Sequence, residues 1–539
     1  MLSKINLKKS RECDVFVIGA GIAGVMSAIQ ASQNGASVII ASSANILSGS
    51  SFYPGTWGLG LIGPENEEDE KDLIRTIKEV GCGVVDEKLV QTFVNNIQKG
   101  IQLIKSMNIK LKEADNKNQK EFIPCFDHKA RNWNGILFDS AKEVFSNKLK
   151  AKNINTYPFS EVIEIIKDKE KVIGVVLINK DKKFEFIKCK SIVIATGGIG
   201  GLFKYRLNTN DITGMGQALA LRSGCKLVNI EFIQMMPGYI NPCPKTIFNE
   251  KTFKYVDILN KDGKDIFEGM ENKLEKLEER STHGPFTSRL ASREIDYRIF
   301  NEFMKDKNGV RVRYKKEIKH QQSEFIKVYF DWLKENKNLT VDDEIQLGIY
   351  FHAANGGIKI DENAQTGVNG LFAAGEVTGG MHGADRIGGL STANGLVFGT
   401  IAGESASRYS SNNIMSNLEE IEIQPYEIEN VEELISELQE IMFKSAMIEK
   451  NEIAIKNAIK RIDTIQSELV YKSDINMENI NKSYRLKANL LLSKCILMAI
   501  DLRKESRGSH YRSDYQECNQ NMNKKIIIEL NDNIDVKFE

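Results

Sequence analysis

Three glycines near the start of the chain have the spacing of a phosphate-binding turn. Gly19, Gly21 and Gly24 form a GxGxxG pattern after the short apolar run 15–18, and an apolar helical pattern begins at Ile22. In such a unit the first glycine permits the tight turn, and the second lets the backbone approach a phosphate at the positive helix end. The third allows the helix to pack closely on the strand. This segment therefore predicts a strand–turn–helix unit that binds the pyrophosphate of a dinucleotide.

Two later segments predict that the chain returns to this sheet. SIVIATGGIGG at 191–201 and GLFAAGEVTGG at 370–380 place glycines, among them Gly197 and Gly375, directly after a buried strand. The second strand of the opening unit ends at Ser42, where NAD-binding folds often carry an acidic residue for a ribose hydroxyl. The absence of that acid weakens the case for NAD.

Composition excludes several classes of protein. The 539 residues include 73 basic and 73 acidic side chains, and the resulting zero net charge argues against nucleic acid or an anionic membrane surface as the main partner. The length predicts two or three domains. The N-terminus, MLSKINLKKSRE, lacks the apolar core of a signal peptide, and no segment approaches the ~18 apolar residues of a membrane span. We therefore expect a cytoplasmic protein without a transmembrane segment.

The eight cysteines are scattered along the chain without a CxxC pair, a CxxCH motif or a cluster at metal spacing. This pattern favours buried free thiols and predicts no metal site. We expect no iron–sulfur cluster or covalent haem in the chain, so long-range electron transfer would need another protein or a diffusible carrier.

Periodicity divides the remainder of the chain. Two β-like runs at 161–178, EVIEIIKD and KVIGVVLI, predict a hairpin. The stretch from about 240 to 350 becomes charged and helical, which indicates an inserted domain. Amphipathic helical patterns dominate after about 415 and predict a helical C-terminal domain.

Four blocks, in order, resemble the flavoprotein subunits of succinate dehydrogenase and fumarate reductase, together with L-aspartate oxidase. The blocks are SSANILSGSSFYPG at 42–55, ATGGIGGLFKYRLNTNDITGMGQALALRSGC at 195–225, HGADRIGGLSTANGLVFGTIAG at 382–403 and ESRGSHYRSDY at 505–515. The resemblance implies an α/β fold with a Rossmann-like FAD-binding domain, an inserted α+β capping domain and a C-terminal helical domain. The expected bounds are 10–238 and 352–415 for the two parts of the FAD-binding domain, 239–351 for the capping (substrate) domain and 416–539 for the helical domain.

The resemblance makes FAD the expected cofactor. Membrane-bound respiratory members of the family carry the flavin covalently on a histidine in the first block, where this chain has Phe52 and Tyr53, so a non-covalent FAD is implied. Glu376 can accept hydrogen bonds from ribose or ribityl hydroxyls, as in similar flavoproteins. Ser391 and Thr392 begin an apolar helix; they can cap it and contact the flavin at its positive end, and the two roles are compatible. The predicted cofactor-binding residues are Gly19, Gly21, Gly24, Ser42, Ser50, Ser51, Gly197, Gly375, Glu376, Ser391 and Thr392.

Three residues from distant segments form the candidate catalytic set: Arg293 in LASREI, His352 in FHAANGG and Arg386 in HGADR. A redox step beside a carboxylate needs cations that hold the carboxylate and a group that gives or takes a proton. The resemblance implies that Arg293 gives or takes the proton and that His352 and Arg386 hold the carboxylate of the substrate. Chemistry alone would not assign the first role, because an arginine stays protonated in nearly every environment.

The expected substrate pocket departs from the family pattern. After Gln234 the chain has Met236 and Gly238, where family members have the histidine and threonine that bind the far end of a C4 dicarboxylate. Fumarate, succinate and aspartate therefore all come into doubt, and a methionine would better line a pocket for an apolar tail. His283 and Thr287 could restore the missing donors from another loop. We expect Gln234, Met236, His283 and Thr287 to line the substrate pocket.

The leading hypothesis is an FAD-dependent oxidoreductase that acts on the CH–CH bond next to a carboxylate. As in fumarate reductase, an enoate would receive hydride from flavin N5 at the β-carbon and a proton from Arg293 at the α-carbon. One alternative is L-aspartate oxidase of NAD biosynthesis, which GSSFY favours and Met236 disfavours. Another is a non-catalytic flavoprotein subunit for electron transfer. The expected partners are a small carboxylate substrate and a separate electron-transfer protein.

Overall fold

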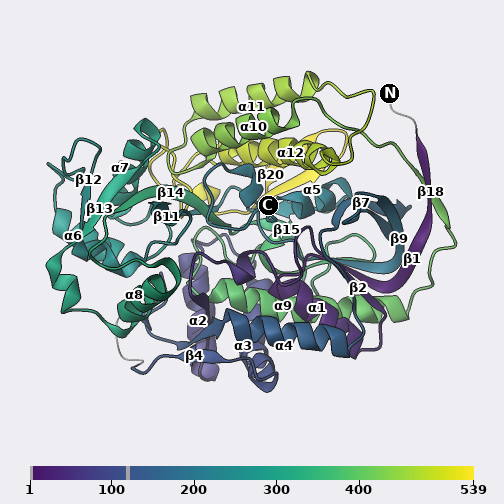
Figure 1. Ribbon diagram of the computed structural model, residues 1–539, viewed down its shortest axis with the longest axis horizontal. Helices are drawn as coiled ribbons and strands as arrows, with labels where there is room; N and C mark the ends of the chain where they lie inside the picture. Colours follow the sequence, from purple (N-terminus) through teal and green to yellow (C-terminus); the bar gives the residue numbers. More distant parts are fainter. Residues whose placement is uncertain (1–3, 117–121) are drawn as a thin grey trace.

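A mixed sheet forms the centre of the protein in the computed structural model, which describes residues 4–116 and 122–539. Its strand order is β6-β2-β1-β9-β8-β7, with β16 also paired to β9 and β18 to β1 (Figure 1). The strands are β1 (Ile5–Ile18), β2 (Val38–Ala41), β6 (Asn155–Tyr157), β7 (Glu161–Asp168), β8 (Lys171–Ile178), β9 (Phe184–Ile194), β16 (Leu371–Ala373) and β18 (Glu420–Ile423). β9 and β16 carry the two later glycine segments back to this sheet in parallel, as predicted. β7 and β8 form the predicted antiparallel hairpin.

Helices cover the parallel part of the sheet, which is why 15–18 of β1 is buried. α1 (Ile22–Gln33), α4 (Phe138–Ala151) and α9 (Leu390–Ser411) lie below the sheet in Figure 1, and α5 (Met215–Arg222) lies above it. α1 and α9 approach closely through glycines: a Cβ on Gly403 would lie 2.4 Å from the carbonyl oxygen of Ser27. The Ser27 hydroxyl also donates to the Gly399 carbonyl oxygen at 2.8 Å.

A smaller layer lies beneath α9. It consists of α2 (Glu67–Val80), α3 (Glu87–Ser106) and a sheet in the order β3-β5-β4 (Gly58–Gly63, Asn132–Leu137, Leu111–Glu113). Asn66 and Asp86 cap the two helices, because each side chain accepts a hydrogen bond from a backbone N–H in the first turn. α3 packs against α9 and so links this layer to the sheet domain.

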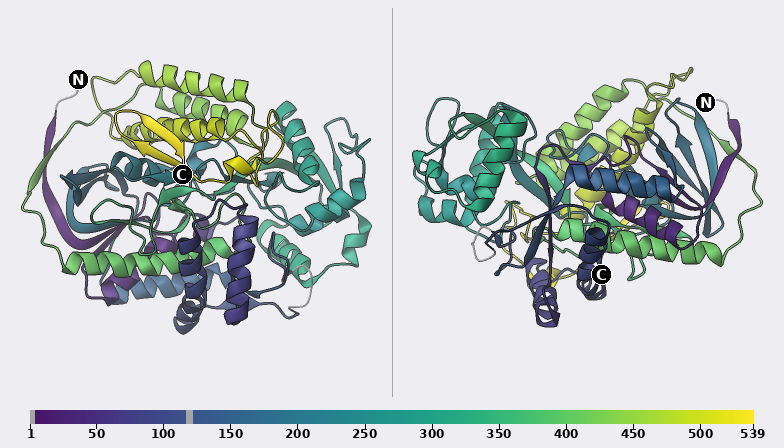
Figure 2. Two further views of the ribbon diagram at one scale, coloured as in Figure 1. Left: turned by 180° about the vertical axis from the view of Figure 1, so that it is seen from behind. Right: turned by 60° about the horizontal axis from the view of Figure 1, so that its bottom comes forward.

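The inserted segment forms a separate lobe, at the left of Figure 1 and, in teal, at the left of the right-hand view in Figure 2. Its sheet has the order β11-β14-β13-β12. The elements are β11 (Ile233–Asn241), β12 (Val256–Leu259), α6 (Lys273–Arg280), α7 (Arg293–Lys305), β13 (Val310–Tyr314), α8 (Glu324–Lys337) and β14 (Ile345–Ala354). The expected capping-domain bounds, 239 and 351, fall inside β11 and β14, which pair with each other. These two strands therefore join the lobe to the FAD-binding part.

The C-terminal region begins with helices and ends in strands. α10 (Val431–Ala446), α11 (Glu452–Ser467) and α12 (Ile480–Leu502) pack together as expected. The hairpin of β19 (Ile526–Leu530) and β20 (Ile534–Phe538) departs from the helical prediction. It completes a sheet with β17 (Thr378–Gly379), β15 (Gly357–Lys359) and β10 (Leu227–Val228), because its isoleucine run is buried against the FAD-binding part.

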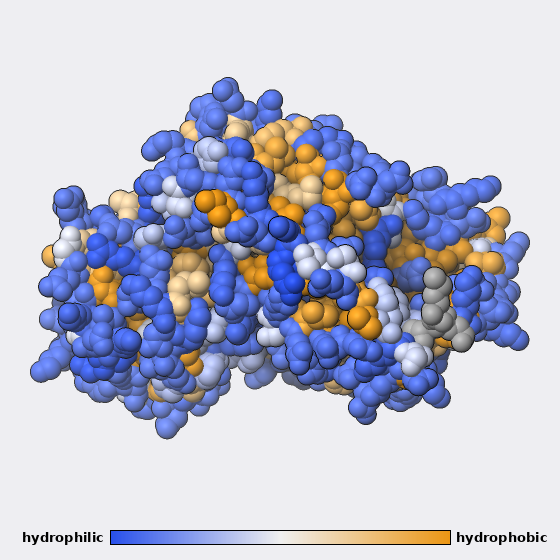
Figure 3. All heavy atoms as spheres, turned by 90° about the horizontal axis from the view of Figure 1, so that it is seen from above, coloured by the Kyte–Doolittle hydropathy of each residue, from blue (hydrophilic) through white to orange (hydrophobic). Residues whose placement is uncertain are grey.

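The face seen in Figure 3 carries mainly hydrophilic residues, with hydrophobic residues in smaller patches between them. Among the helices that the structure describes, none is both long and apolar enough to cross a bilayer. Within the described ranges there is also no group of three or more histidine, cysteine or acidic residues that could hold a metal ion.

Candidate functional site

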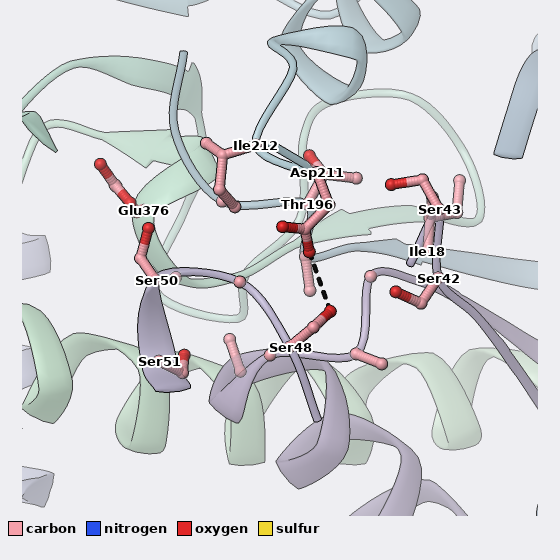
Figure 4. Close-up of a pocket in the computed structure, with 18 of the residues that line it drawn as sticks. Ile18, Ser42, Ser43, Ser48, Ser50, Ser51, Thr196, Asp211, Ile212 and Glu376 are labelled. Atoms are coloured by element: carbon pink, nitrogen blue, oxygen red, sulfur yellow. Dashed lines mark hydrogen bonds between the residues drawn. The ribbon is translucent and has the colours of Figure 1, made fainter. Parts of the chain in front are cut away.

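A cavity lies where β1 and β2 end and where α1 and α9 begin (Figure 4). Nearly the whole predicted cofactor set lines it. The lining members are Gly19, Gly21, Ser42, Ser50, Ser51, Gly197, Gly375, Glu376, Ser391 and Thr392. Two helix N-termini thus meet one cavity, which is the electrostatic setting that an anionic dinucleotide requires.

Gly19 and Gly24 of the opening motif must be glycine for different structural reasons. Gly19 has φ +104°, and a Cβ there would lie 2.3 Å from the carbonyl oxygen of Ala195 on the neighbouring strand. Gly24 does not line the cavity, but a Cβ there would lie 1.9 Å from the Gly19 carbonyl oxygen. Gly24 therefore acts through helix–strand packing, the role predicted for the third glycine.

The serines around the cavity differ in what they already bind. Ser51 Oγ accepts from the backbone N–H of Ile22 at 3.0 Å and so holds the first residue of α1. Ser42 Oγ donates to the carbonyl oxygen of Asn45 at 3.2 Å. Ser50 Oγ and Thr196 Oγ1 are buried and have no hydrogen-bond partner among the described residues. Buried hydroxyls without partners are costly, so these two fit a polar ligand in the cavity.

Glu376 lies in the short 3-10 helix η6 (Gly375–Val377) that follows β16. Its Oε1 accepts from the backbone N–H of Ala354 at 3.2 Å. Burial raises the pKa of this carboxyl, whereas the hydrogen bond and Arg386 lower it. The carboxyl lines the cavity, where it can accept a hydrogen bond from a hydroxyl group of a ligand.

The structure adds cavity residues that the sequence analysis did not include, chiefly Ser48, Thr196 and Asp211. Ser48 Oγ donates to Asp211 Oδ2 at 2.8 Å, the contact dashed in Figure 4. Thr196 could have been found from its position directly after the β9 strand. Asp211 carries no comparable local signal, because only the fold brings its loop to the cavity. The hydroxyls, the acidic group and the two helix ends together fit the hydroxyl and phosphate groups of FAD.

Arg386 is the central residue of a second, adjacent group. Its Nη2 donates to Gln234 Oε1 at 2.7 Å, and its side chain is buried, with the residue 9 % exposed. Within the described chain this guanidinium forms no ion pair, and burial lowers its pKa. The negative charge of Glu376 opposes this decrease without forming an ion pair, so the buried guanidinium fits a further anionic ligand.

His352 on β14 lies within the electrostatic range of Arg386. Burial, with a smaller effect of Arg386, lowers the pKa of His352 to about 3, so its imidazole is neutral at pH 7. His352 Nδ1 and Gln234 Nε2 are both buried and lack partners among the described residues. Arg386, His352 and Gln234 therefore form a group with unused hydrogen-bonding capacity.

Arg293, the third predicted catalytic residue, lies elsewhere in the capping lobe. Its Nη1 donates to the carbonyl oxygen of Ser288 at 2.9 Å, and its guanidinium lies 5.7 Å from the centre of the Tyr511 ring. It lines a different cavity, together with Glu294 and Tyr511. Arg289 reaches the Arg386 loop instead, because its Nε donates to Asp385 Oδ2 at 2.7 Å.

The two residues expected to replace the missing donors are already bound. His283 is stacked on Phe126 and contacts the Pro285 carbonyl oxygen at 2.7 Å through Nδ1. Thr287 Oγ1 donates to Asp385 Oδ2 at 2.7 Å. In this structure both side chains hold loops together, and neither is free to bind a substrate.

Met236 lies in an apolar cluster with Tyr53, Leu207 and Tyr350. A Cβ on Gly284 of the capping lobe would lie 3.1 Å from Met236 Cε, 3.6 Å from Cys125 Sγ and 3.6 Å from Glu250 Cδ. The three side chains therefore converge at one point. Cys125 and Glu250 were not among the predicted residues, since a lone cysteine and a lone acid carry no motif.

Comparison with protein families matches residues 14–392 to the family described as FAD binding domain. Residues 435–539 match the family described as fumarate reductase flavoprotein C-term. The chain belongs to the fumarate reductase and L-aspartate oxidase family of flavoproteins. It is an FAD-dependent oxidoreductase, as the resemblance implied.

Individual relatives align with most of the chain. An uncharacterized FAD-dependent oxidoreductase of Methanocaldococcus jannaschii is 30% identical over 68% of this chain and 70% of its own. One subunit of the fumarate reductase (CoM/CoB) of Methanothermobacter marburgensis is 26% identical, with 96% of this chain and 97% of the relative covered. L-aspartate oxidase of Yersinia pestis is 25% identical, with 95% and 98% covered.

Solved structures share the fold. Sdh1 of Mycobacterium smegmatis in complex with UQ1 superposes with a TM-score of 0.80 at 22% identity, covering 98% of this chain and 94% of that one. A quinol-fumarate reductase with menaquinol molecules gives a TM-score of 0.79 at 21% identity, with 98% of both chains covered. The predicted α/β class with its FAD-binding and C-terminal parts is therefore confirmed.

Proposed function

We propose that this flavoenzyme reduces the carbon–carbon double bond beside the carboxylate of an enoate. The observation that supports this reaction is Arg386, a buried guanidinium with one hydrogen bond to Gln234 and no ion pair in the described chain. A substrate carboxylate would supply the missing negative charge through charge-assisted hydrogen bonds. Glu376, which lines the proposed FAD cavity, interacts electrostatically with Arg386, and this interaction supports a substrate carboxylate next to the flavin.

The residues around the cavity at the beginnings of α1 and α9 would hold FAD without a covalent bond. Ser50, Thr196 and Glu376 offer polar atoms to its hydroxyl groups, and the beginnings of α1 and α9 face its phosphates and ring system. When bound, FAD supplies the hydride chemistry of the reaction. The protein excludes water and fixes the orientation of the substrate.

His352 and Gln234 would orient the same carboxylate. Because the pKa of His352 is lowered to about 3, the imidazole contributes a hydrogen bond without a charge. Gln234 Nε2 is a second donor that lacks a partner in the described chain. Binding a carboxylate would satisfy both groups and offset the cost of burying Arg386.

We retain Arg293 as the proposed proton donor on the family resemblance alone. Its contacts with Ser288 and Tyr511 hold it at the edge of the capping lobe. To deliver a proton its side chain would have to move toward Arg386. Arg289 is the comparison residue, since it lies in the same segment and contacts the Arg386 loop.

L-aspartate oxidation is the second candidate. The L-aspartate oxidase of Yersinia pestis aligns with 95% of this chain. The surroundings of Met236 disfavour this activity, because Met236 and Gly238 face apolar side chains: a Cβ on Gly238 would lie 2.7 Å from Leu207 Cδ2. Neither residue offers a donor to a second carboxylate.

The test is anaerobic and uses the FAD-loaded protein. The flavin is reduced chemically, and fumarate or crotonate is then added while flavin absorbance is followed. Enoate reduction predicts rapid return of the oxidised spectrum with at least one of the two acids. If neither acid reoxidises the flavin but L-aspartate reduces the oxidised enzyme, the proposal is wrong and the second candidate replaces it.

A separate protein would supply the electrons in the cell. The similarity to a relative named as part of a multi-subunit fumarate reductase supports this proposal. A reduced-flavin preparation that turns over enoates only once, and regains steady turnover when cell extract is added, would agree with it.

A further inference from the structure

A basic cleft lies where the FAD-binding part meets the capping lobe. The segments 53–55 and 208–210 of the FAD-binding part contribute to its lining, together with Pro244, Lys245 and Lys337 of the capping lobe. Two of these lining residues are lysines, and none carries an acidic side chain. The cleft is therefore positively charged.

Arg206 adds a third positive charge next to this lining. Its Nη2 donates to Asn210 Oδ1 at 3.1 Å. Burial lowers the pKa of Lys245, and the positive charge of Arg206 lowers it further. Two like charges that are held close together destabilise each other, and an anion bound between them would reverse this effect.

The three cations form no ion pair with an acidic residue of the described chain. Arg206 Nη1 donates to the carbonyl oxygen of Phe203 at 3.0 Å. The Lys337 ammonium group lies 5.6 Å from the centre of the Trp332 ring. The Lys245 ammonium group has neither a hydrogen bond nor an ion pair with a described residue. An anionic ligand would therefore supply the charge that this part of the protein lacks.

Polar atoms of the segment 206–209 also lack partners. Arg206 Nε, Thr209 Oγ1 and the Asn208 amide are buried and form no hydrogen bond with a described residue. Asn208 and Thr209 both line the cleft, and Asn208 is 1 % exposed. Buried polar groups normally have partners, so these groups fit a small polar ligand in the cleft.

The cleft is distinct from the proposed FAD cavity, although one loop lines both. Asn210 lines the cleft, whereas the next residue, Asp211, lines the FAD cavity and accepts from Ser48 Oγ at 2.8 Å. No residue that lines the cleft also lines the FAD cavity. A ligand in the cleft would therefore bind in addition to FAD.

We propose that this cleft binds a phosphate group, either as free phosphate or as the ester of a small molecule. A phosphate group carries about 1.5 to 2 negative charges at pH 7 and has three strong acceptor oxygens. It can accept from Lys245 and Lys337 together, whereas a single carboxylate compensates only one charge. An acidic protein surface fits less well, because Thr209 Oγ1 is buried and only a small group would reach it.

Calorimetric titration of the FAD-loaded protein at constant ionic strength tests this proposal. The probes are inorganic phosphate, glycerol 3-phosphate, acetate and the acidic peptide hexaglutamate. We expect at least one of the two phosphate compounds to bind at a single site, and acetate to bind about tenfold more weakly or less. Lys245→Met and Lys337→Met should each weaken phosphate binding by about 10- to 100-fold, as for the loss of a hydrogen bond between charged groups.

Two further variants serve as controls. Lys334→Met removes a lysine from an exposed position of the same helix as Lys337, outside the cleft lining, and should leave phosphate affinity unchanged. Lys337→Arg keeps the charge and should retain most of the affinity. Thermal unfolding of each variant checks that the fold is intact.

The outcomes identify the source of the phosphate or overturn the proposal. Tighter binding of glycerol 3-phosphate than of phosphate, lost in Lys245→Met, would support an ester, and the reverse order would support free phosphate. Equal binding of acetate and phosphate, or phosphate binding that neither lysine substitution weakens, would overturn the proposal. Binding of hexaglutamate without either phosphate compound would show a docking surface for an acidic protein and also overturn it, as would the absence of any binding.

Discussion

Replacing Arg386 with methionine should abolish activity while leaving the fold nearly as stable as before. Arg386 is buried without an ion pair, and burial lowers its pKa, so its charge costs folding free energy in the absence of substrate. Arg386→Met removes that cost. It also removes the 2.7 Å hydrogen bond to Gln234, whose loss costs about 1–3 kcal/mol. The two effects oppose each other, and we expect a net change within about 2 kcal/mol.

Arg280 provides a matched control. It is buried like Arg386, but its Nε and Nη2 bind the two carboxylate oxygens of Asp296 at 2.7 and 2.9 Å. Arg280→Met would leave Asp296 buried and unpaired, which typically costs about 3–5 kcal/mol. The two buried arginines should therefore differ clearly in what their loss does to stability.

The assay combines denaturant unfolding with flavin reoxidation by an enoate. In Arg386→Met, the lost charge-assisted hydrogen bonds should lower kcat/KM by at least about 100-fold, which corresponds to about 3 kcal/mol. Destabilisation of Arg386→Met as large as that of Arg280→Met would refute the reasoning, because it would show that Arg386 has a structural partner. Unchanged turnover would refute its role in substrate binding.

Three further predictions test other parts of the structure. Arg293→Lys should abolish turnover and leave FAD bound if Arg293 is the proton donor; normal turnover in this variant, with loss in Arg289→Lys, would transfer the role to Arg289. Burial lowers the pKa of His283, His352, His382 and His510, so the unfolded chain binds more protons below about pH 6.5 and stability falls with decreasing pH. His352, whose pKa is lowered to about 3, should contribute a loss of about 2 kcal/mol between pH 7 and 5, and urea unfolding of His352→Gln should show a pH dependence smaller by about one proton. Gly24→Ala should prevent FAD loading and destabilise the fold, because the new Cβ would lie 1.9 Å from the Gly19 carbonyl oxygen. Gly35→Ala is the control: no atom lies within 4 Å of its Cβ, so it should cost only about 1 kcal/mol for its positive φ. Equal FAD content in the two variants would contradict this prediction.

The opening nucleotide-binding unit was predictable because its determinants are local. Gly19, Gly21 and Gly24 act within one strand, one turn and one helix, so their spacing already contains the physical constraint. The later strands β9 and β16 were predictable for the same reason, since each is a buried run that ends in glycines. The hairpin β19–β20 was missed because it is stabilised by pairing with β10, about 300 positions earlier in the chain.

The sequence by itself determined the family, the cofactor and a third of the residues around the proposed FAD cavity, because these depend on motifs whose members are close together in the chain. Only the tertiary structure decided which charges are compensated. It showed that Arg386 binds Gln234 and forms no ion pair with a described residue, whereas Arg280 and Arg289 bind carboxylates. Whether a buried charge has a partner depends on side chains from distant segments, and no local pattern records their arrangement.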